Sequence, residues 1–462
     1  MLSIFFDIGS TFTKAVAIDL NRDEIIGKAK SPSTVNEDVR IGIKKVLDDI
    51  YAQTGLKIDD FELKKASSSA AGGLKIVAVG LVPDLTAEAA KKAALGAGGK
   101  VLKTYSFELT ESDIQEIESL KPDIIILAGG TDGGNRYYPL VNAKRLAKTS
   151  LSVPVIFAGN KDIRDEVKKI FEEEKKEIHI TENVMPEYNV LNIKPVQEII
   201  REIFLKRIIY AKGLDKAQSI IGQFVMPTPL AVLKSLEVFA KKYGESILID
   251  IGGATTDVCS VSEGSPKKPG VVLKGLPEPF VKRTVEGDLG VRVSALFLLE
   301  SIGKNSLEKF FNNVDHIEEK IKFLSENTSY LPQNDEDLYL DYVLSYFAAK
   351  IAVERHVGFL EVIYSPLGVI YFQHGKDLTE VKNVLATGGP LINNPYRKEI
   401  LKACIYSKED PFILKPKEPS FYLDKEYILY AVGLLSEFME DRALNLLERY
   451  LLGVEANYEY KK

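Results

Sequence analysis

Cysteine is almost absent from this sequence of 462 residues, in which only Cys259 and Cys404 occur. Because the two do not form a C-x-x-C pair, the sequence excludes a disulfide framework and a cysteine-based zinc cluster, and it favours a reducing compartment. No apolar run approaches the roughly 20 residues that cross a bilayer, and no positive segment followed by an apolar core opens the chain. We therefore expect a cytoplasmic protein without a membrane partner.

Excess positive charge is also lacking. The 60 Lys and Arg residues are outnumbered by 66 Asp and Glu residues, which gives a formal net charge of -6. Binding to nucleic acid requires a basic surface, so we expect no nucleic acid partner. The 4 histidines are not spaced as in metal-binding motifs such as H-E-x-x-H. The length predicts two to four globular domains.

What the sequence does contain is one glycine-rich hairpin pattern in two copies. Residues 4–19 read IFFDIGSTFTKAVAID, and residues 248–261 read LIDIGGATTDVCSV. In each copy an apolar run ends in Asp-x-Gly, residues with hydroxyl groups follow, and a second apolar run returns. This pattern predicts two strands joined by a turn. Its repetition about half a chain length later predicts a duplicated lobe.

The residue types in these hairpins suit the binding of a magnesium-bound polyphosphate. Glycine lets the backbone approach phosphate oxygens, and successive N–H groups and hydroxyls donate to them from a concave nest. An aspartate beside such a nest can hold Mg²⁺ through water. We therefore expect Asp7 and Asp250 to organise Mg²⁺. The expected phosphate donors are Gly9, Ser10, Thr11, Thr13, Lys14, Gly252, Gly253, Thr255 and Thr256, although Lys14 also fits a surface strand position.

Three further features are candidates for the same site. In LATGGP, Thr387-Gly388-Gly389 follows a short apolar strand, and the two glycines would let the backbone approach a base or a ribose. Asp257, at the far end of the second turn, is expected either to orient water or to cap the turn. Glu286 and Asp288 in RTVEGDLG are candidates to complete the catalytic set, but Asp288 equally fits the N-cap of a following helix.

The order of apolar periodicities predicts an α/β chain with an inserted domain. Four strand–helix alternations between residues 74 and 181, with continuously apolar strands, predict a parallel, doubly wound sheet covered on both faces. The expected parts are 1–73 and 182–240 for the first lobe with the interlobe helices, 74–181 for the insertion, 241–424 for the second lobe, and 425–462 for a C-terminal helix that packs back on the lobes.

The order and spacing of the hairpins and the glycine turn resemble the actin, sugar-kinase and seventy-kilodalton heat-shock ATPase superfamily. This resemblance implies two ribonuclease-H-like lobes with ATP and Mg²⁺ bound between them. More specifically, the segments ILAGGTDGGN, NVMPEYNVLNI, DIGGATTDVCSV and RTVEGDLGVR resemble the MutL family of glutamate mutase accessory proteins, which is distinct from the mismatch-repair protein of the same name. The likeness covers nearly the whole chain. It implies a slow, partner-stimulated ATPase and chaperone that reactivates an adenosylcobalamin-dependent mutase by exchanging damaged cobalamin.

Two positions depart from the patterns of these relatives. The insertion resembles the flavodoxin-like cobalamin domains of the mutases, in which a histidine of D-x-H-x-x-G ligates cobalt, but the matching stretch from Asp84 has Thr86 there. We expect the insertion to mimic a cobalamin subunit without holding the cofactor, or else to be a generic doubly wound domain. Met226 in VMPTPLAVL stands where heat-shock ATPases have a water-orienting glutamate. This difference implies slow intrinsic hydrolysis.

Three other functions remain open from the sequence. A small-molecule kinase of the same superfamily requires a catalytic carboxylate that faces an acceptor pocket, and only Glu286 and Asp288 are candidates. An actin-like filament protein is a structural alternative, for which the insertion makes head-to-tail stacking awkward. A corrinoid-binding carrier is the third alternative, and the absence of the cobalt-ligating histidine at Thr86 argues against it.

Overall fold

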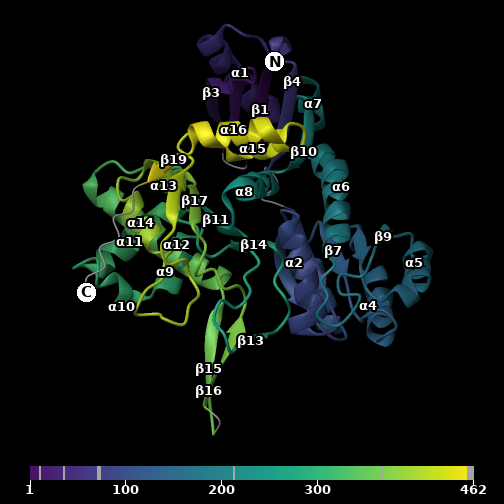
Figure 1. Ribbon diagram of the computed structural model, residues 1–462. Helices are drawn as coiled ribbons and strands as arrows, with labels where there is room; N and C mark the ends of the chain where they lie inside the picture. Colours follow the sequence, from purple (N-terminus) through teal and green to yellow (C-terminus); the bar gives the residue numbers. More distant parts are fainter. Residues whose placement is uncertain (10–11, 35–36, 70–73, 212–213, 367, 455–462) are drawn as a thin grey trace. The chain divides into compact units, whose positions relative to one another are not determined.

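The computed structural model describes residues 1–9, 12–34, 37–69, 74–211, 214–366 and 368–454 (Figure 1). The chain is an α/β protein with mixed and parallel sheets, as the sequence predicts. It divides into two compact units. Unit 1 comprises Met1–Ser235, Gly275–Pro279 and Ile428–Leu446, and unit 2 comprises Leu236–Lys274, Phe280–Tyr427 and Leu447–Lys462. Within the described ranges, no helix is both long enough and apolar enough to cross a membrane.

The first sheet of unit 1 contains the N-terminal hairpin and has the strand order β10-β4-β1-β2-β3. Its strands are β1 (Leu2–Ile8), β2 (Phe12–Asp19), β3 (Glu24–Pro32), β4 (Leu63–Ser68) and β10 (Gln223–Pro227). The first three strands pair antiparallel, whereas β4 runs parallel to β1 and β10 runs parallel to β4. Helices α1 (Val39–Thr54) and α7 (Leu214–Ile221) contribute buried side chains such as Ile43 and Ile221 to its core.

The second sheet of unit 1 lies in the predicted insertion, and all five of its strands are parallel. The strand order is β6-β5-β7-β8-β9, with β5 (Lys75–Val79), β6 (Lys100–Tyr105), β7 (Ile124–Leu127), β8 (Val155–Phe157) and β9 (Ile178–Ile180). In order along the chain this is 2-1-3-4-5, one of the two common orders of doubly wound sheets. Continuous apolar strands form it because both of its faces are buried.

Each face of this parallel sheet has its own apolar core. One core includes side chains from α3 (Glu111–Leu120), α4 (Tyr137–Ala147) and α5 (Arg164–Glu173). The other includes side chains from α2 (Glu88–Gly96) and from α6 (Lys194–Ala211), among them Val196 and Ile200. The packing of this sheet therefore extends past residue 181, where the predicted insertion ends. Helix α3 begins with the predicted capping box, in which Thr110 and Asp113 bond reciprocally.

The main sheet of unit 2 repeats the topology of the first sheet of unit 1. Its order is β14-β12-β11-β17-β18-β19, with β11 (Ser246–Ile251), β12 (Thr256–Val261), β14 (Val281–Glu286), β17 (Asn383–Thr387), β18 (Ser420–Leu423) and β19 (Leu452–Val454). As in unit 1, three antiparallel strands are followed by two that run parallel to the first strand of the hairpin. The duplication predicted from the two hairpins is thus visible in strand order and direction.

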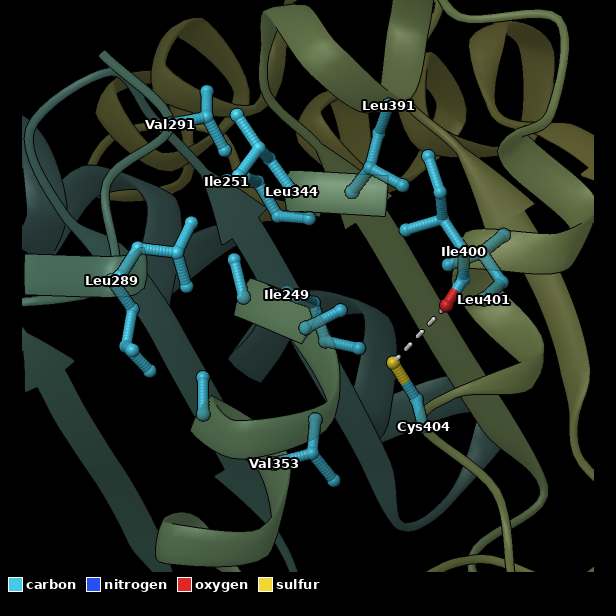
Figure 2. Close-up of a cluster of buried hydrophobic side chains, with 14 of the residues drawn as sticks. Ile249, Ile251, Leu289, Val291, Leu344, Val353, Leu391, Ile400, Leu401 and Cys404 are labelled. Carbon is cyan, nitrogen blue, oxygen red and sulfur yellow. Dashed lines mark hydrogen bonds between the residues drawn. The ribbon is translucent and has the colours of Figure 1, made fainter. Parts of the chain in front are cut away.

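Helices cover a large apolar core beside this sheet, part of which Figure 2 shows. The helices are α9 (Ala295–Ile302), α10 (Lys304–Leu307), α11 (Val314–Glu326), α12 (Asp335–His356), α13 (Gly389–Asn393) and α14 (Arg397–Lys402). Ile249 and Ile251 of β11 lie among Leu344 and Val353 of α12. The alternation of inward apolar residues along β11 with the polar Asp250 leaves that aspartate outside this cluster.

The described chain also contains helix α8 (Thr228–Tyr243), a small sheet and two helices near the C-terminus. The sheet has the order β13-β16-β15, with β13 (Val271–Lys274), β15 (Phe359–Ser365) and β16 (Gly368–His374). Near the C-terminus the sequence predicts one helix from residue 425, but the structure has two, α15 (Leu429–Ser436) and α16 (Glu440–Tyr450). Helix α15 packs on β1 and β4 of unit 1.

Candidate nucleotide-binding hairpins

The first hairpin, β1–β2, turns at Gly9. The Gly9 N–H donates to the carbonyl of Phe12 at 2.9 Å. A Cβ at Gly9 would lie 2.7 Å from that carbonyl oxygen, so the turn requires glycine. Ser10 and Thr11, two of the predicted phosphate donors, lie outside the described residues.

Asp7 is the last charged residue of β1 and is only 4% exposed. Its Oδ2 lies 3.4 Å from Lys14 Nζ on β2, and its Oδ1 accepts a hydrogen bond of 2.7 Å from the hydroxyl of Thr228. Lys30 is the register partner of Lys14 on β3. Burial, and then the positive charge of Lys14, lower the pKa of Lys30. The sheet thus places two lysines on one side of Asp7.

Two other predicted positions near this hairpin are fully buried. Thr13 is 0% exposed, and its hydroxyl has no hydrogen-bond partner among the residues that the structure describes. Met226 on β10 is also 0% exposed. The structure thus places the thioether of Met226 in the interior of unit 1.

The second hairpin, β11–β12, closes with the same bond as the first. The Gly252 N–H donates to the carbonyl of Thr255 at 2.9 Å, and a Cβ at Gly252 would lie 3.0 Å from that oxygen. A neighbouring segment also binds the turn, because the N–H groups of Val291 and Arg292 donate to the carbonyls of Gly252 and Gly253 at 3.2 and 2.9 Å. Backbone contacts therefore fix the shape of this turn.

The third predicted turn, at Gly388, lies against Asp250. Thr387 is the parallel register partner of Asp250, and Gly388 has φ +100°. A Cβ at Gly388 would lie 2.2 Å from the carbonyl oxygen of Ile251 and 2.9 Å from Asp250 Oδ1. Only glycine fits there. Gly389, in contrast, has open space where its Cβ would be.

The remaining polar residues of the second hairpin are held by neighbours in unit 2. Asp257 Oδ1 accepts a hydrogen bond of 2.8 Å from Arg283, whose side chain is nearly buried, and Asp257 Oδ2 lies 3.4 Å from the Thr255 hydroxyl. The Thr256 hydroxyl donates to the carbonyl of Leu289 at 2.7 Å and is buried. The Thr256 hydroxyl is therefore bonded to the backbone of unit 2, whereas the Thr255 hydroxyl lies at the turn near Asp257.

Glu286 and Asp288 are both paired with one arginine. Arg355 Nη1 lies 2.8 Å from Glu286 Oε2 and 2.8 Å from Asp288 Oδ1. Burial, the largest single influence, opposes ionisation of Asp288, but hydrogen bonds from Arg355, the backbone and Ser301, together with the positive charge of Arg355, outweigh it and lower the pKa of the carboxyl. The prediction that Asp288 caps the next helix is wrong, since α9 begins at Ala295 after Ser294. The chain between them instead supports the second hairpin turn.

Sequence reasoning missed three residues that the structure brings to the hairpins. Thr228 and Ser67 lie beside Asp7, with 3.1 Å between their hydroxyl oxygens. Asp424, after β18, accepts a hydrogen bond of 3.0 Å from the Thr387 hydroxyl and is 1% exposed. Each stands at or just beyond the end of a buried parallel strand. That position is a usable signal, because such strand ends meet at one edge of a sheet.

The residues present fit a magnesium ion of the kind that nucleotides carry. Among the described residues there is no group of three or more His, Cys, Asp or Glu that could hold a metal directly. Mg²⁺ needs fewer, because it keeps several waters and takes one or two carboxylates together with phosphate oxygens. Asp7 and Asp250 each present a single carboxylate beside a glycine turn, which suits this mode.

Comparisons with known proteins agree with the family that the sequence resembles. A family model described as MutL protein matches residues 3–451. "Protein MutL" of Clostridium tetanomorphum is 47% identical over 459 residues, which are 98% of this chain and 99% of that protein.

Solved structures give weaker similarities. Component A of (R)-2-hydroxyglutaryl-CoA dehydratase from Acidaminococcus fermentans has a TM-score of 0.28 and 11% identity, over 97% of this chain and 99% of that one. Xylulose kinase from Bifidobacterium adolescentis has a TM-score of 0.33 and 11% identity, over 98% and 96%. Similarities at this level support no statement about function. The match over almost the entire chain, and the relative at 47% identity, show that this chain belongs to the MutL family.

Proposed function

We propose that this chain is a cytoplasmic, ATP-dependent accessory protein that binds Mg-ATP through its two glycine hairpins and reactivates an adenosylcobalamin-dependent mutase of the glutamate mutase type. The observation that carries nucleotide binding is the matched pair of turns, in which Gly9 donates to Phe12 and Gly252 to Thr255, each at 2.9 Å. Each turn follows an aspartate at a strand end. Successive N–H groups in such turns form anion-binding concavities.

The residues of the two hairpins have separable roles in this proposal. Asp7 and Asp250 hold Mg²⁺ through water, and the ion, when bound, neutralises charge on the phosphates. Lys14 adds positive charge beside the first turn, and Gly253 and Thr255 offer donors in the second. Since Met226 is buried and has no acceptor for a proton, we expect unstimulated ATP hydrolysis to be slow.

The parallel sheet of unit 1 supports the idea of a cobalamin domain mimic that holds no corrinoid. Its strand order is that of flavodoxin-like domains. At Thr86, where those domains have the cobalt-ligating histidine, the hydroxyl accepts hydrogen bonds from the N–H groups of Leu81 and Val82 at 2.7 and 3.3 Å. A Cβ at Gly80 would lie 2.3 Å from the nitrogen of Ala87, so the loop is packed directly on the strand end. These residues do not fit a corrinoid ligand.

A small-molecule kinase would need a carboxylate that accepts a proton from the acceptor substrate. Glu286 and Asp288 both pair with Arg355, and Asp288, whose pKa is lowered, is a poor proton acceptor. We therefore favour a partner-directed ATPase over a small-molecule kinase.

The test combines a candidate mutase with this protein. Glutamate mutase is loaded with cyanocobalamin, and corrinoid release is followed by absorbance after separation of free corrinoid, with and without Mg-ATP. The variants are Asp7→Asn and, as a matched control in unit 1, Asp49→Asn, which removes an exposed carboxylate from α1. We expect release that requires Mg-ATP, persists in Asp49→Asn and is lost in Asp7→Asn.

Nucleotide affinity, measured by calorimetry, separates the two parts of the proposal. We expect Asp7→Asn to weaken Mg-ATP binding at least tenfold, about the effect of losing one strong interaction with a charged group. Normal nucleotide binding without corrinoid release from any cobalamin mutase would overturn the reactivation step. Absence of nucleotide binding by the unmodified chain would overturn the proposal as a whole.

A further inference from the structure

Two hydroxyl groups from distant parts of the sequence meet the carboxylate of Asp7. Thr228 Oγ1 lies 2.7 Å from Asp7 Oδ1 and 3.1 Å from Ser67 Oγ. A threonine hydroxyl has one proton to donate. With that proton given to the Asp7 carboxylate, the 3.1 Å contact needs the Ser67 proton, whose other acceptor, the carbonyl of Phe6, lies farther away at 3.4 Å. The result is a chain of two hydrogen bonds that ends on the predicted metal-organising residue.

Strand register places Asp7 and Ser67 side by side and brings the start of helix α8 close to them. Ser67 on β4 is the parallel partner of Asp7 on β1, and Met226 on β10 is the parallel partner of Ser67. Thr228 follows two residues later as the first residue of helix α8 (Thr228–Tyr243). Ser67 is 0% exposed and Asp7 is 4% exposed. Asp7 and Ser67 are therefore packed within unit 1, whereas Thr228 is partly exposed.

The two oxygens of the Asp7 carboxylate have different neighbours. Oδ1 is bonded to the Thr228 hydroxyl, whereas Oδ2 lies 3.4 Å from Lys14 Nζ. A carboxylate held at one oxygen cannot rotate freely about its terminal bond, so the other oxygen keeps a fixed direction. Oδ2 is thus the carboxylate oxygen that faces the Lys14 ammonium group.

We propose that Thr228, itself oriented by Ser67, is a positioning residue for magnesium. By holding Oδ1 it leaves Oδ2 on the side of Lys14, where this oxygen would be available to the cation of a Mg-nucleotide. This inference rests on the proposed nucleotide function and assigns a role that the hairpin motif alone does not contain. Because Thr228 opens α8, the same hydrogen bond joins the start of that helix to the first hairpin.

The test compares Thr228→Val, which keeps the shape and removes the hydroxyl, with Thr228→Ser, which restores it. Binding of a non-hydrolysable ATP analogue is titrated by calorimetry in excess Mg²⁺ and in EDTA, and thermal unfolding checks that each variant is folded. We expect Thr228→Val to weaken the Mg-dependent affinity about tenfold, as for other lost bonds to a charged group. Affinity in EDTA should stay within about twofold of the unmodified protein, and Thr228→Ser should recover most of the loss.

The outcomes distinguish the inference from the function on which it rests. If the unmodified protein binds the analogue with Mg²⁺ and Thr228→Val shows the same Mg²⁺ dependence, the positioning role is wrong while the proposed function stands. An equal loss with Mg²⁺ and in EDTA would also overturn it, because that pattern indicates a structural role only. If the unmodified protein binds no nucleotide, both proposals fail.

Discussion

Acidification should destabilise unit 2 through one buried histidine. His356, the last residue of α12, is 0% exposed, and its ring nitrogens lie 2.8 Å from the Ser260 hydroxyl and 2.9 Å from the Thr284 hydroxyl. Burial, reinforced by the positive charges of Lys282 and Lys376, holds the pKa of His356 well below 6.5. The folded unit therefore keeps this imidazole neutral at a pH where the unfolded chain protonates it.

The size of the effect follows from proton linkage. Above pH 6.5 both states carry a neutral histidine, so this residue adds no pH dependence. Below that pH the unfolded state binds one more proton than the folded state, and the free energy of unfolding falls by about 1.4 kcal/mol per pH unit. Between pH 7.5 and 5.0 the expected loss from His356 alone is about 2 kcal/mol. It continues to grow until the pH reaches the depressed folded value.

The two cysteines provide an assay that reports on unit 2 alone. Cys259 and Cys404 are buried in this unit, and the sequence contains no others. Their reaction with a pyridyl disulfide, which works in acid, measures opening of the unit in increasing urea without interference from unit 1. His356→Gln offers hydrogen-bonding groups but does not titrate in this range.

The comparison is the difference in pH dependence between the two proteins. We expect the opening free energy of the unmodified protein to fall by about 2 kcal/mol more than that of His356→Gln between pH 7.5 and 5.0. The same pH dependence in both proteins would refute the reasoning, because it would show that the folded unit protonates His356 as easily as the unfolded chain does.

Two further substitutions test the packing of each unit. In unit 1 a Cβ at Gly433 would lie 1.7 Å from the carbonyl oxygen of Ala231, so Gly433→Ala should lower the free energy of unfolding by about 1–3 kcal/mol or more in urea titrations. The control Gly453→Ala, in unit 2, has nothing within 4 Å of the added Cβ and should have little effect. In unit 2 the nearly buried Arg292 lies 2.7 Å from Asp341, whose pKa is raised by burial. Arg292→Leu should lower the free energy of unfolding by about 3–5 kcal/mol near neutral pH, as measured by thiol labelling. The loss should be smaller in acid, where Asp341 is protonated, and an equal loss at both pH values would contradict this reasoning.

Local pattern was sufficient to predict both hairpins. Asp-x-Gly between two apolar runs fixes a short antiparallel pair wherever the turn needs glycine, and Gly9 and Gly252 each have a carbonyl within 3.0 Å of the missing Cβ. The strand–helix alternation between residues 74 and 181 predicted the parallel sheet in the same way. These features depend on residues that are neighbours in the sequence.

Long-range register decided what the sequence did not show. Thr228 is 221 residues from Asp7, and only the pairing of β1 with β4 and of β4 with β10 brings them together. Arg355 reaches Asp288 from the end of α12 in the same way, which is why the local N-cap pattern at Asp288 was misleading. Helix α6, which lies beyond the predicted end of the insertion at residue 181, also contributes Val196 and Ile200 to a core of the parallel sheet.

The duplicated topology places different chemistry beside the same turn. In unit 1 Ser67 is the register partner of Asp7, and Thr228 follows the next strand, so two hydroxyls lie beside the hairpin carboxylate. In unit 2 the Thr387 hydroxyl, next to Asp250, instead donates to Asp424, away from the hairpin. Backbone geometry is therefore set by the repeated motif, whereas the neighbouring strands decide how each aspartate is held. In unit 1 this gives the Asp7 carboxylate a direction set by the Thr228 hydroxyl, which is the role that Thr228→Val tests.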